Sequence, residues 1–230
     1  VASRWPVALE RDDLRVVHAA WRSAAIAAAR QLPLGQLINA YDTWEAEART
    51  LGLQSQVGRR MSDQLSRWGG DLESPAQAPP FMPAHAENEV NKQMLNPLKV
   101  LTSGVEREGH TPFFAGGKWR FVQRVGWWDD YADATPVVVG HYWRRRHPIA
   151  GAGRHDEDLF AHIPPLAWHG QRGNVFCVDY SVGGRWLARQ RHEPPARDFK
   201  LAALQWPEQV LVFDDGSREA TEGFAQPASA

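Results

Sequence analysis

Two histidines in this chain each follow a run of apolar residues. His18 ends the segment Leu14-Arg15-Val16-Val17-His18, and His141 ends Pro136-Val137-Val138-Val139-Gly140-His141. Such β-branched runs predict buried strands, and open α/β sheets bind ligands beyond the carboxyl ends of their strands. Imidazole is a common metal ligand. The pair therefore predicts a metal site that both histidines share, although a hydrogen-bonded histidine at a strand end gives the same pattern.

Residues close to the two histidines in sequence could support the same chemistry. Gly140 has no side chain, so it would let the backbone turn sharply and approach a metal. Asp179 follows another apolar run, Asn174-Val175-Phe176-Cys177-Val178, and could either orient a histidine as a hydrogen-bond acceptor or cap a turn. Arg144 and Arg145 follow His141, where guanidinium groups could clamp a substrate phosphate or form a solvated charge run.

Three further features carry weaker signals. His110 lies in Gly109-His110-Thr111, but no β-branched run precedes it, so we do not predict it as a ligand. Trp127 and Trp128 could stack on a nucleotide base, but core packing is the more common role of paired tryptophans. Cys177 lies within an apolar run without a basic neighbour in sequence, which disfavours a nucleophilic thiolate.

The composition narrows the classes of partner. The chain has 230 residues, of which 26 are basic and 27 acidic, for a formal net charge of -1. No overall field therefore attracts nucleic acid polymers or anionic membranes. No stretch approaches the roughly 20 apolar residues of a membrane-spanning helix. The single cysteine cannot form an internal disulfide, so we expect a cytoplasmic protein; the oligomeric state stays open.

The elements that position these residues change from helical to β along the chain. A first strand at about 13–19 leads into a helical region at about 21–104, which is interrupted by a proline-rich connection at 69–83. A β-rich region at about 117–215 follows, and residues 218–230 are expected to form a disordered tail. The strands expected in the β-rich region are 119–125, 136–139, 174–180, 186–191, 202–206 and 209–213.

Five segments together resemble the calcineurin-like metallophosphoesterases, in the bacterial branch related to serine/threonine phosphatases and diadenosine tetraphosphatases. They are residues 14–21, 96–104, 124–128, 139–143 and 174–181. Their order and spacing match the C-terminal half to two-thirds of that domain. The resemblance implies an α/β fold over residues 1–217: an incomplete αββα sandwich of mixed sheets, with a helical insertion between the first strand and the C-terminal β-rich part.

The resemblance also implies a metal-dependent phosphoric ester hydrolase that acts on phosphoproteins or dinucleoside polyphosphates. In this family six ligands hold two divalent ions of manganese, iron or zinc, and a nucleophile derived from water attacks phosphorus in line. The resemblance implies that His18 and His141 are ligands of the second ion. The earlier motifs do not match, because Gly70-Asp71 continues as Leu72-Glu73 and Gly173-Asn174 continues as Val175.

The missing ligands limit what the chain can do. Two divalent ions held close together repel one another and need anionic ligands between and around them, which two neutral imidazoles do not supply. Because the chain also opens on Val1, we expect a C-terminal portion of an enzyme domain that is inactive alone. The alternative is a non-catalytic binding or scaffold relative. A serine hydrolase is disfavoured, since no Gly-x-Ser-x-Gly elbow occurs.

Overall fold

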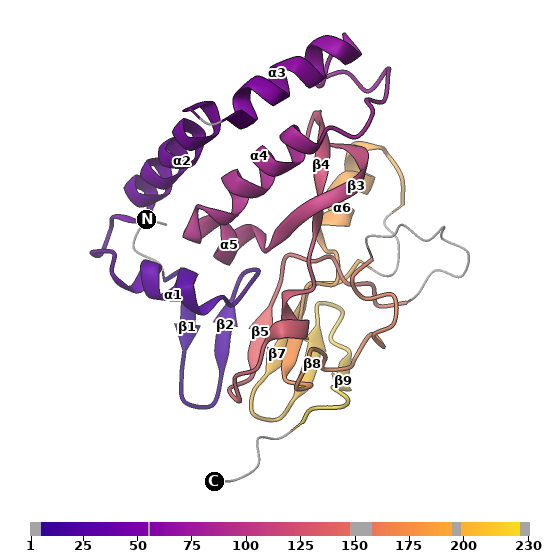
Figure 1. Cartoon of the computed structure of the whole chain (residues 1–230). Coiled ribbons are helices and arrows are strands. Elements are labelled where there is room, and N and C mark those ends of the chain that lie inside the picture. Colours follow the sequence, from indigo (N-terminus) through magenta and orange to yellow (C-terminus); the bar gives the residue numbers. More distant parts are fainter. Residues whose placement is uncertain (1–5, 55, 148–157, 195–198, 226–230) are drawn as a thin grey trace. The chain divides into compact units, whose positions relative to one another are not determined.

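The structure is a computed structural model that describes residues 6–54, 56–147, 158–194 and 199–225. Within these residues the chain is mixed α/β, with six α-helices and three sheets (Figure 1), which confirms the predicted α/β class. It divides into two compact units. We call Val1–Pro6 with Arg22–Val125 the helical unit, and Val7–Trp21 with Gly126–Ala230 the sheet unit. No helix in the described part of the chain is long and apolar enough to cross a membrane.

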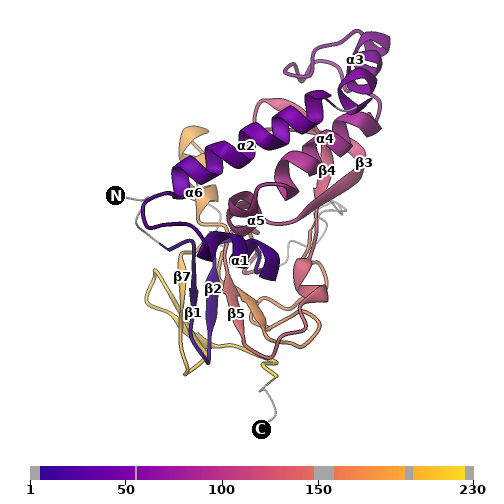
Figure 2. The same ribbon diagram turned by 60° about the vertical axis from the view of Figure 1, so that its left-hand side comes forward.

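The helical unit packs five helices and a β-hairpin around a small core. Its elements are α1 (Ser23–Arg30), α2 (Leu37–Gln54), α3 (Gln56–Trp68), α4 (Pro83–Met94), α5 (Pro97–Ser103), β3 (Glu106–Ala115) and β4 (Lys118–Arg124). Helix α4 contacts α2 and α3 on one side and the hairpin on the other (Figures 1 and 2). Met82, Ala86 and Phe121 form the buried centre. The irregular connection predicted at 69–83 is confirmed as far as residue 82, where α4 is about to begin.

The β-hairpin belongs with the helices rather than with the β-rich region that the sequence predicts. Trp119 Nε1 donates to the carbonyl oxygen of Ser74 at 2.8 Å, and the Phe121 N–H donates to Glu89 Oε2 at 3.0 Å. These bonds attach β4 to the irregular connection and to α4. Strand β3 lacks a clean alternation of buried and exposed residues, which explains why its pattern does not predict a strand. His110 is exposed within it.

Asn96 caps α5 from a fully buried position. Its Oδ1 accepts from the N–H groups of Leu98 (3.1 Å) and Lys99 (3.4 Å), and its Nδ2 donates to Tyr41 O at 3.1 Å. We expect Asn96→Ala to lower the free energy of unfolding by about 1–2 kcal/mol, because it removes a cap and leaves buried backbone groups unpaired. Urea denaturation would measure this. Asn39→Ala, at an exposed site, should change it by less than about 0.5 kcal/mol, and equal losses would argue against the cap.

The sheet unit packs a four-stranded sheet against a three-stranded antiparallel one. The first sheet has the order β1 (Ala8–Glu10), β2 (Arg15–Val17), β5 (Val137–Val139) and β6 (Val175–Cys177), and the second contains β7 (Ala202–Gln205), β8 (Val210–Phe213) and β9 (Arg218–Ala220). Strands β1 and β2 are antiparallel, whereas β2, β5 and β6 run parallel. Figure 2 shows β1, β2 and β5 side by side. The parallel arrangement brings the carboxyl ends of three strands to one edge.

The core of the sheet unit lies between its two sheets. Val138 and Phe176 of the first sheet pack with Leu211 and Phe213 of β8 and with Tyr180. The valines that flank these residues in β5 and β6 point to the opposite face and are at most 1% exposed. Strands buried on both faces are expected to be apolar throughout, as β5 and β6 are.

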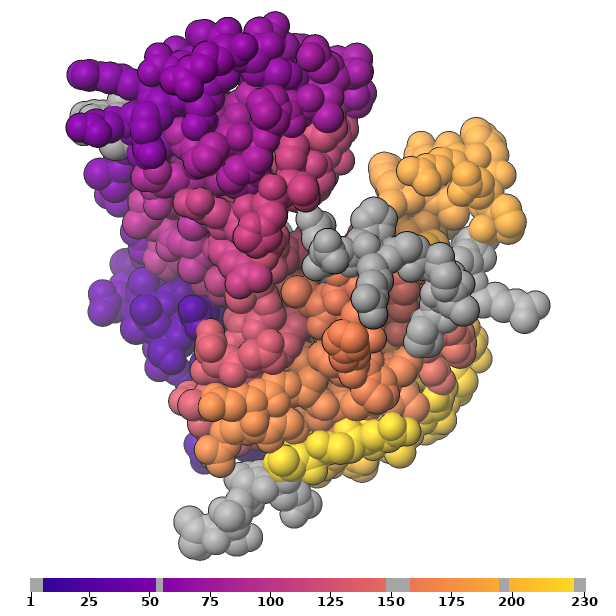
Figure 3. Space-filling view, turned by 45° about the vertical axis from the view of Figure 1, so that its right-hand side comes forward, coloured from indigo at the N-terminus to yellow at the C-terminus, as the bar shows by residue number. Residues whose placement is uncertain are grey.

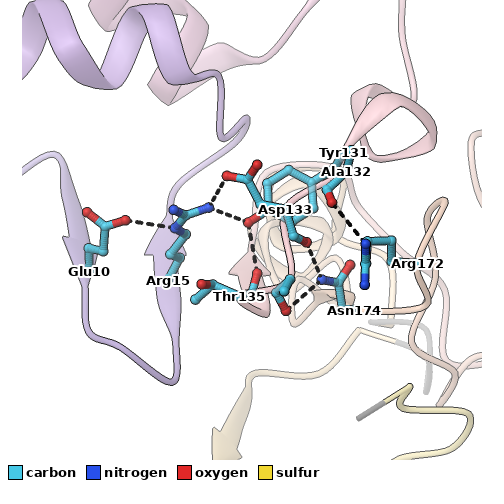
Figure 4. A network of polar contacts seen from close by, with 9 residues as sticks. Glu10, Arg15, Tyr131, Ala132, Asp133, Thr135, Arg172 and Asn174 are labelled. Carbon is cyan, nitrogen blue, oxygen red and sulfur yellow. Dashed lines mark hydrogen bonds and ion pairs between the residues drawn. The ribbon is translucent and has the colours of Figure 1, made fainter. Parts of the chain in front are cut away.

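A polar network joins the amino-terminal ends of the parallel strands (Figure 4). Arg15, at the start of β2, bonds to Glu10 at 2.8 Å, to Asp133 at 2.5 Å and to the Tyr131 hydroxyl at 2.6 Å. Asn174, just before β6, donates to the Asp133 carbonyl oxygen at 2.9 Å. Arg15 thus bonds to other side chains and Asn174 to the backbone, at the edge of the sheet opposite to His18, and these bonds link β1, β2 and β6 to the segment before β5.

Two elements of the sheet unit correct the sequence prediction. The strand predicted at 186–191 is wrong, because α6 spans Gly183–Gln190; the leucine, alanine, arginine and glutamine of this segment favour a helix. The disordered tail predicted for 218–230 is wrong for its first residues. Strand β9 pairs with β8, and the Phe224 ring packs 4.6 Å from that of Trp168. Residues 226–230 lie outside the described residues.

Candidate functional site

The carboxyl ends of the parallel strands bring His18, His141 and Asp179 to one edge of the sheet. His18 directly follows β2, His141 lies two residues beyond β5, and Asp179 lies two residues beyond β6. The ring centroids of His18 and His141 are 5.5 Å apart, and the ring planes are inclined by 66°. The predicted convergence of the two imidazoles is therefore confirmed, although the whole helical unit separates them in sequence.

This spacing can be compared with that of two imidazoles on one metal ion. With metal–nitrogen distances of about 2.0–2.1 Å and tetrahedral angles, two ring centroids lie roughly 5 Å apart. The observed 5.5 Å agrees with one shared ion. Among the described residues, no group of three or more His, Cys, Asp and Glu side chains could hold a metal ion. The edge therefore fits part of one ion's ligand set, and the described residues do not fit a complete two-ion centre.

The backbone at His141 is strained. His141 has φ 69°, and the Tyr142 N–H donates to Gly140 O at 2.8 Å, which closes a three-residue turn. Turns of this kind with positive φ are rare and strained. Trp143 (φ 54°) and Ser181 (φ 60°) are also left-handed, next to the same edge. The sharp turn predicted at Gly140 thus lies one residue later. Backbone strain of this kind concentrates at functional sites.

Gly140 lies between the residues of the edge. Its N–H donates to His18 O at 2.9 Å. A Cβ at this position would lie 3.5 Å from His18 O and 3.9 Å from both His18 Nδ1 and Asp179 Cβ. A side chain would therefore project between His18 and Asp179, and glycine keeps that space open. The close approach of Gly140 to a metal remains a prediction.

Asp179 caps a turn, which is one of the two roles predicted for it. Its Oδ1 accepts from the Ser181 N–H at 2.9 Å, and Ser181 Oγ donates to Arg144 O at 3.0 Å. The second carboxylate oxygen makes no hydrogen bond with a described residue. Asp179 therefore stabilises the loop after β6 and retains one oxygen for a further partner.

The structure corrects the prediction for Arg144, whose side chain is buried with 1% of it exposed. The guanidinium donates to the carbonyl oxygens of Ala167 (2.8 Å), Cys177 (3.5 Å) and Pro164, and lies 5.1 Å above the Phe176 ring. Burial lowers the pKa of Arg144 below its ordinary value. Because this cation is bonded inside the unit, it is not available to bind a substrate phosphate.

Arg145 has the opposite environment to its neighbour. Its side chain is exposed and makes no hydrogen bond or ion pair with a described residue. It lies four residues beyond His141, so it stays a candidate for binding a phosphate group. The third arginine of the run, Arg146, forms an ion pair with Glu219 of β9.

The aromatic pair and the cysteine are part of the core. Trp127 and Trp128 are each 1% exposed, and Trp127 Nε1 donates to Ala19 O at 3.1 Å. Core packing, rather than base stacking, is therefore the role that their burial allows. Cys177 is fully buried, and burial raises the pKa of its thiol to about 12. Its thiolate is not available as a nucleophile.

The sequence pattern assigns no role to Trp143, which lies two residues beyond His141 and is 46% exposed. The available signal was its place directly after the Gly140-His141 turn. A large aromatic residue with a left-handed backbone is uncommon, and this one is exposed and directly follows the His141 turn, so we include it in the candidate site.

Comparisons of the chain with protein-family models, with curated proteins and with solved structures found no match. The assignment of a function therefore depends on the carboxyl edge of β2, β5 and β6. The titratable side chains at this edge are two imidazoles and one carboxylate.

Proposed function

We propose that the chain is part of a metal-dependent phosphoric ester hydrolase in which His18 and His141 bind one divalent ion. The observation that supports this is the 5.5 Å distance between the two imidazole rings at the carboxyl edge of parallel strands. The resemblance of residues 14–21 and 139–143 to the calcineurin-like metallophosphoesterases supports the same activity, with manganese, iron or zinc as the ion. The finer fold, an incomplete αββα sandwich, is part of this proposal.

The residues at and near this edge would have separate roles in binding the metal ion and the substrate. His18 and His141 would hold an ion through neutral imidazole nitrogens, so its uptake competes with protons. A divalent ion bound there supplies neutralisation of phosphoryl charge and activation of water. Gly140 keeps the space beside His18 open. Arg145 offers an exposed guanidinium for a phosphate of the substrate, a phosphoprotein side chain or a dinucleoside polyphosphate.

Calorimetric titration of the chain with manganese chloride tests the ligand assignment. We expect uptake of one ion per chain and not of two, since the described residues offer two imidazoles and no third ligand grouped with them. His18→Ala and His141→Ala should each weaken this binding by about tenfold or more. His110→Ala, at an exposed position of β3, is the matched control and should leave it unchanged. Tight binding of two ions, or unchanged binding in both site variants, would contradict the proposal.

The second candidate function is a non-catalytic binding or scaffold relative of the same fold. Among the described residues no group of three or more His, Cys, Asp and Glu side chains could hold a metal ion, and this favours the second candidate. Hydrolysis of p-nitrophenyl phosphate in excess manganese separates the two functions. If the protein hydrolyses this ester and His18→Ala abolishes the hydrolysis, the protein is an enzyme. If the chain joined to any upstream coding sequence binds metal but does not hydrolyse the ester, it is a binding relative.

A further inference from the structure

Two tryptophans are exposed on the sheet unit, and one of them, Trp143, lies two residues beyond His141. Trp143 is 46% exposed and Trp186, in α6, is 60% exposed. Figure 3 shows α6, in light orange, standing out from the surface of this unit. Tryptophan is the largest apolar side chain, and exposed apolar surface of this size often marks a binding site.

Both tryptophans are associated with the first turn of α6, one by contact and one by its place in the helix. The Trp143 ring packs against Gly183, the first residue of the helix, since a Cβ on Gly183 would lie 3.1 Å from a ring atom of Trp143. Trp186 is three residues further on, which places it on the same face of the helix as Gly183. Trp143 therefore contacts the first turn of α6, and Trp186 projects from the helix face that carries this contact.

The position of this pair is fixed relative to the histidines. Trp143 follows the strained turn at His141, and both residues have positive φ. Ser181, two residues before α6, donates from Oγ to Arg144 O at 3.0 Å and from its N–H to Asp179 Oδ1 at 2.9 Å. Through these bonds the start of α6, the segment that carries Trp143 and the carboxyl edge form one connected structure.

We propose that Trp143 and Trp186 bind an aromatic ring on the organic part of a phosphate ester. The proposal deepens the hydrolase function and rests on it for the phosphate part of the ligand. Indole faces stack on any planar ring, so the shared chemistry covers a purine base and the phenyl ring of a phosphorylated tyrosine. The exposed Arg145 lies two residues beyond Trp143 and can bind the phosphate of the same ligand.

Isothermal titration of the chain with paired ligands tests the subsite. The pairs are adenosine 5′-monophosphate against ribose 5-phosphate, and O-phosphotyrosine against O-phosphoserine, each with and without manganese. We expect at least one aromatic ligand to bind about 5- to 150-fold more tightly than its non-aromatic partner. The pair with the larger ratio identifies a base or a phenyl ring as the group recognised. Equal affinities within both pairs would overturn the proposal.

Variants assign the preference to the two tryptophans. Trp186→Ala changes an exposed helix residue and should remove most of the aromatic preference without unfolding the chain, as circular dichroism would verify. Trp143→Ala should do the same, and Trp143→Phe should retain part of it if the alanine variant does not fold. Leu201→Ala, 58% exposed in the same unit, is the control and should keep the preference. A preference that survives Trp186→Ala and Trp143→Phe undiminished would refute the assignment.

A separate variant distinguishes this proposal from the metal site. His18→Ala should abolish any gain in affinity that manganese provides, while the aromatic preference measured without manganese stays. If manganese never affects binding but the preference depends on Trp186, the metal assignment fails and the aromatic subsite holds. If manganese binding depends on His18 but no aromatic preference exists, the subsite fails alone.

Discussion

Arg144→Ala should lower the free energy of unfolding by about 3–5 kcal/mol, because it leaves buried carbonyl groups without donors and creates a cavity. Arg144 is 1% exposed and bonds to carbonyl oxygens of Pro164, Ala167 and Cys177. Arg144→Met, which fills much of the same space, should lose less. Urea denaturation followed by tryptophan fluorescence would measure both changes.

The adjacent arginine is a matched control for this experiment. Arg145 is exposed and has no partner among the described residues, so Arg145→Ala should change stability by less than about 0.5 kcal/mol. Arg144→Lys should recover little of the loss, because one ammonium cannot reproduce the planar fork that reaches several carbonyl groups. Equal effects of Arg144→Ala and Arg145→Ala would show that the buried bonds contribute nothing measurable.

The histidine edge was accessible to sequence reasoning because it follows from local patterns and one topological rule. The valine runs before His18 and His141 predict buried strands, and β2 and β5 occur at those positions. Ligands gather where parallel strands end, so the meeting of the two imidazoles needed no knowledge of the intervening helices. The parallel pairing of β2 with β5 supplies that geometry.

The burial of the side chains in the loop after His141 cannot be predicted from the sequence in the same way. Arg144 is buried, Arg145 exposed and Arg146 paired with Glu219. No periodicity sets this pattern, since the partners of Arg144 lie 20 or more residues away in sequence. Long-range contacts of this kind decide burial in irregular segments, and three successive arginines carry no signal of them.

In α6 the sequence contains signals for two different structures. Most of its residues favour a helix, but its glycines and its tryptophan favour a turn and a strand. Gly183 and Gly184 indicate a turn, and Trp186 favours a strand, yet both glycines lie inside the helix. At Gly184 a Cβ would lie 2.5 Å from the Phe199 ring, so a larger residue would force that ring to move. Both glycines therefore allow close packing by aromatic rings, which depends on tertiary contacts and cannot be predicted from the local sequence. The exposure of Trp186 depends in turn on its place in the helix.

His169 should make the protein sensitive to acid. Its side chain is 6% exposed, its ring centroid lies 4.8 Å from that of Trp128, and neither ring nitrogen makes a hydrogen bond of normal geometry with a described residue. Burial, together with the nearby charge of Arg144, lowers the pKa of His169 to about 3. The folded protein therefore keeps this imidazole neutral at pH values where an exposed histidine takes up a proton.

The sign of the effect follows from proton linkage. Below about pH 6.5, the ordinary pKa of histidine, the unfolded chain binds a proton at His169 that the folded chain does not bind. The free energy of unfolding should then fall by about 1.4 kcal/mol per pH unit down to about pH 3, where the folded state is protonated too. Above about pH 6.5 both states are neutral, so His169 contributes no pH dependence there.

A variant isolates this contribution from the carboxylates that also titrate in acid. His169→Leu should remove the histidine part of the slope between pH 6.5 and 4.5, so that at pH 4.5 it gains roughly 2–3 kcal/mol relative to the parent protein, measured against their difference at pH 7.5. His162→Leu, at an exposed position, should leave the slope unchanged. Identical slopes for His169→Leu and the parent would mean that His169 becomes protonated within the fold. In that case its ring must find an acceptor, and the Ala167 carbonyl oxygen, which acts to raise its pKa, is a candidate.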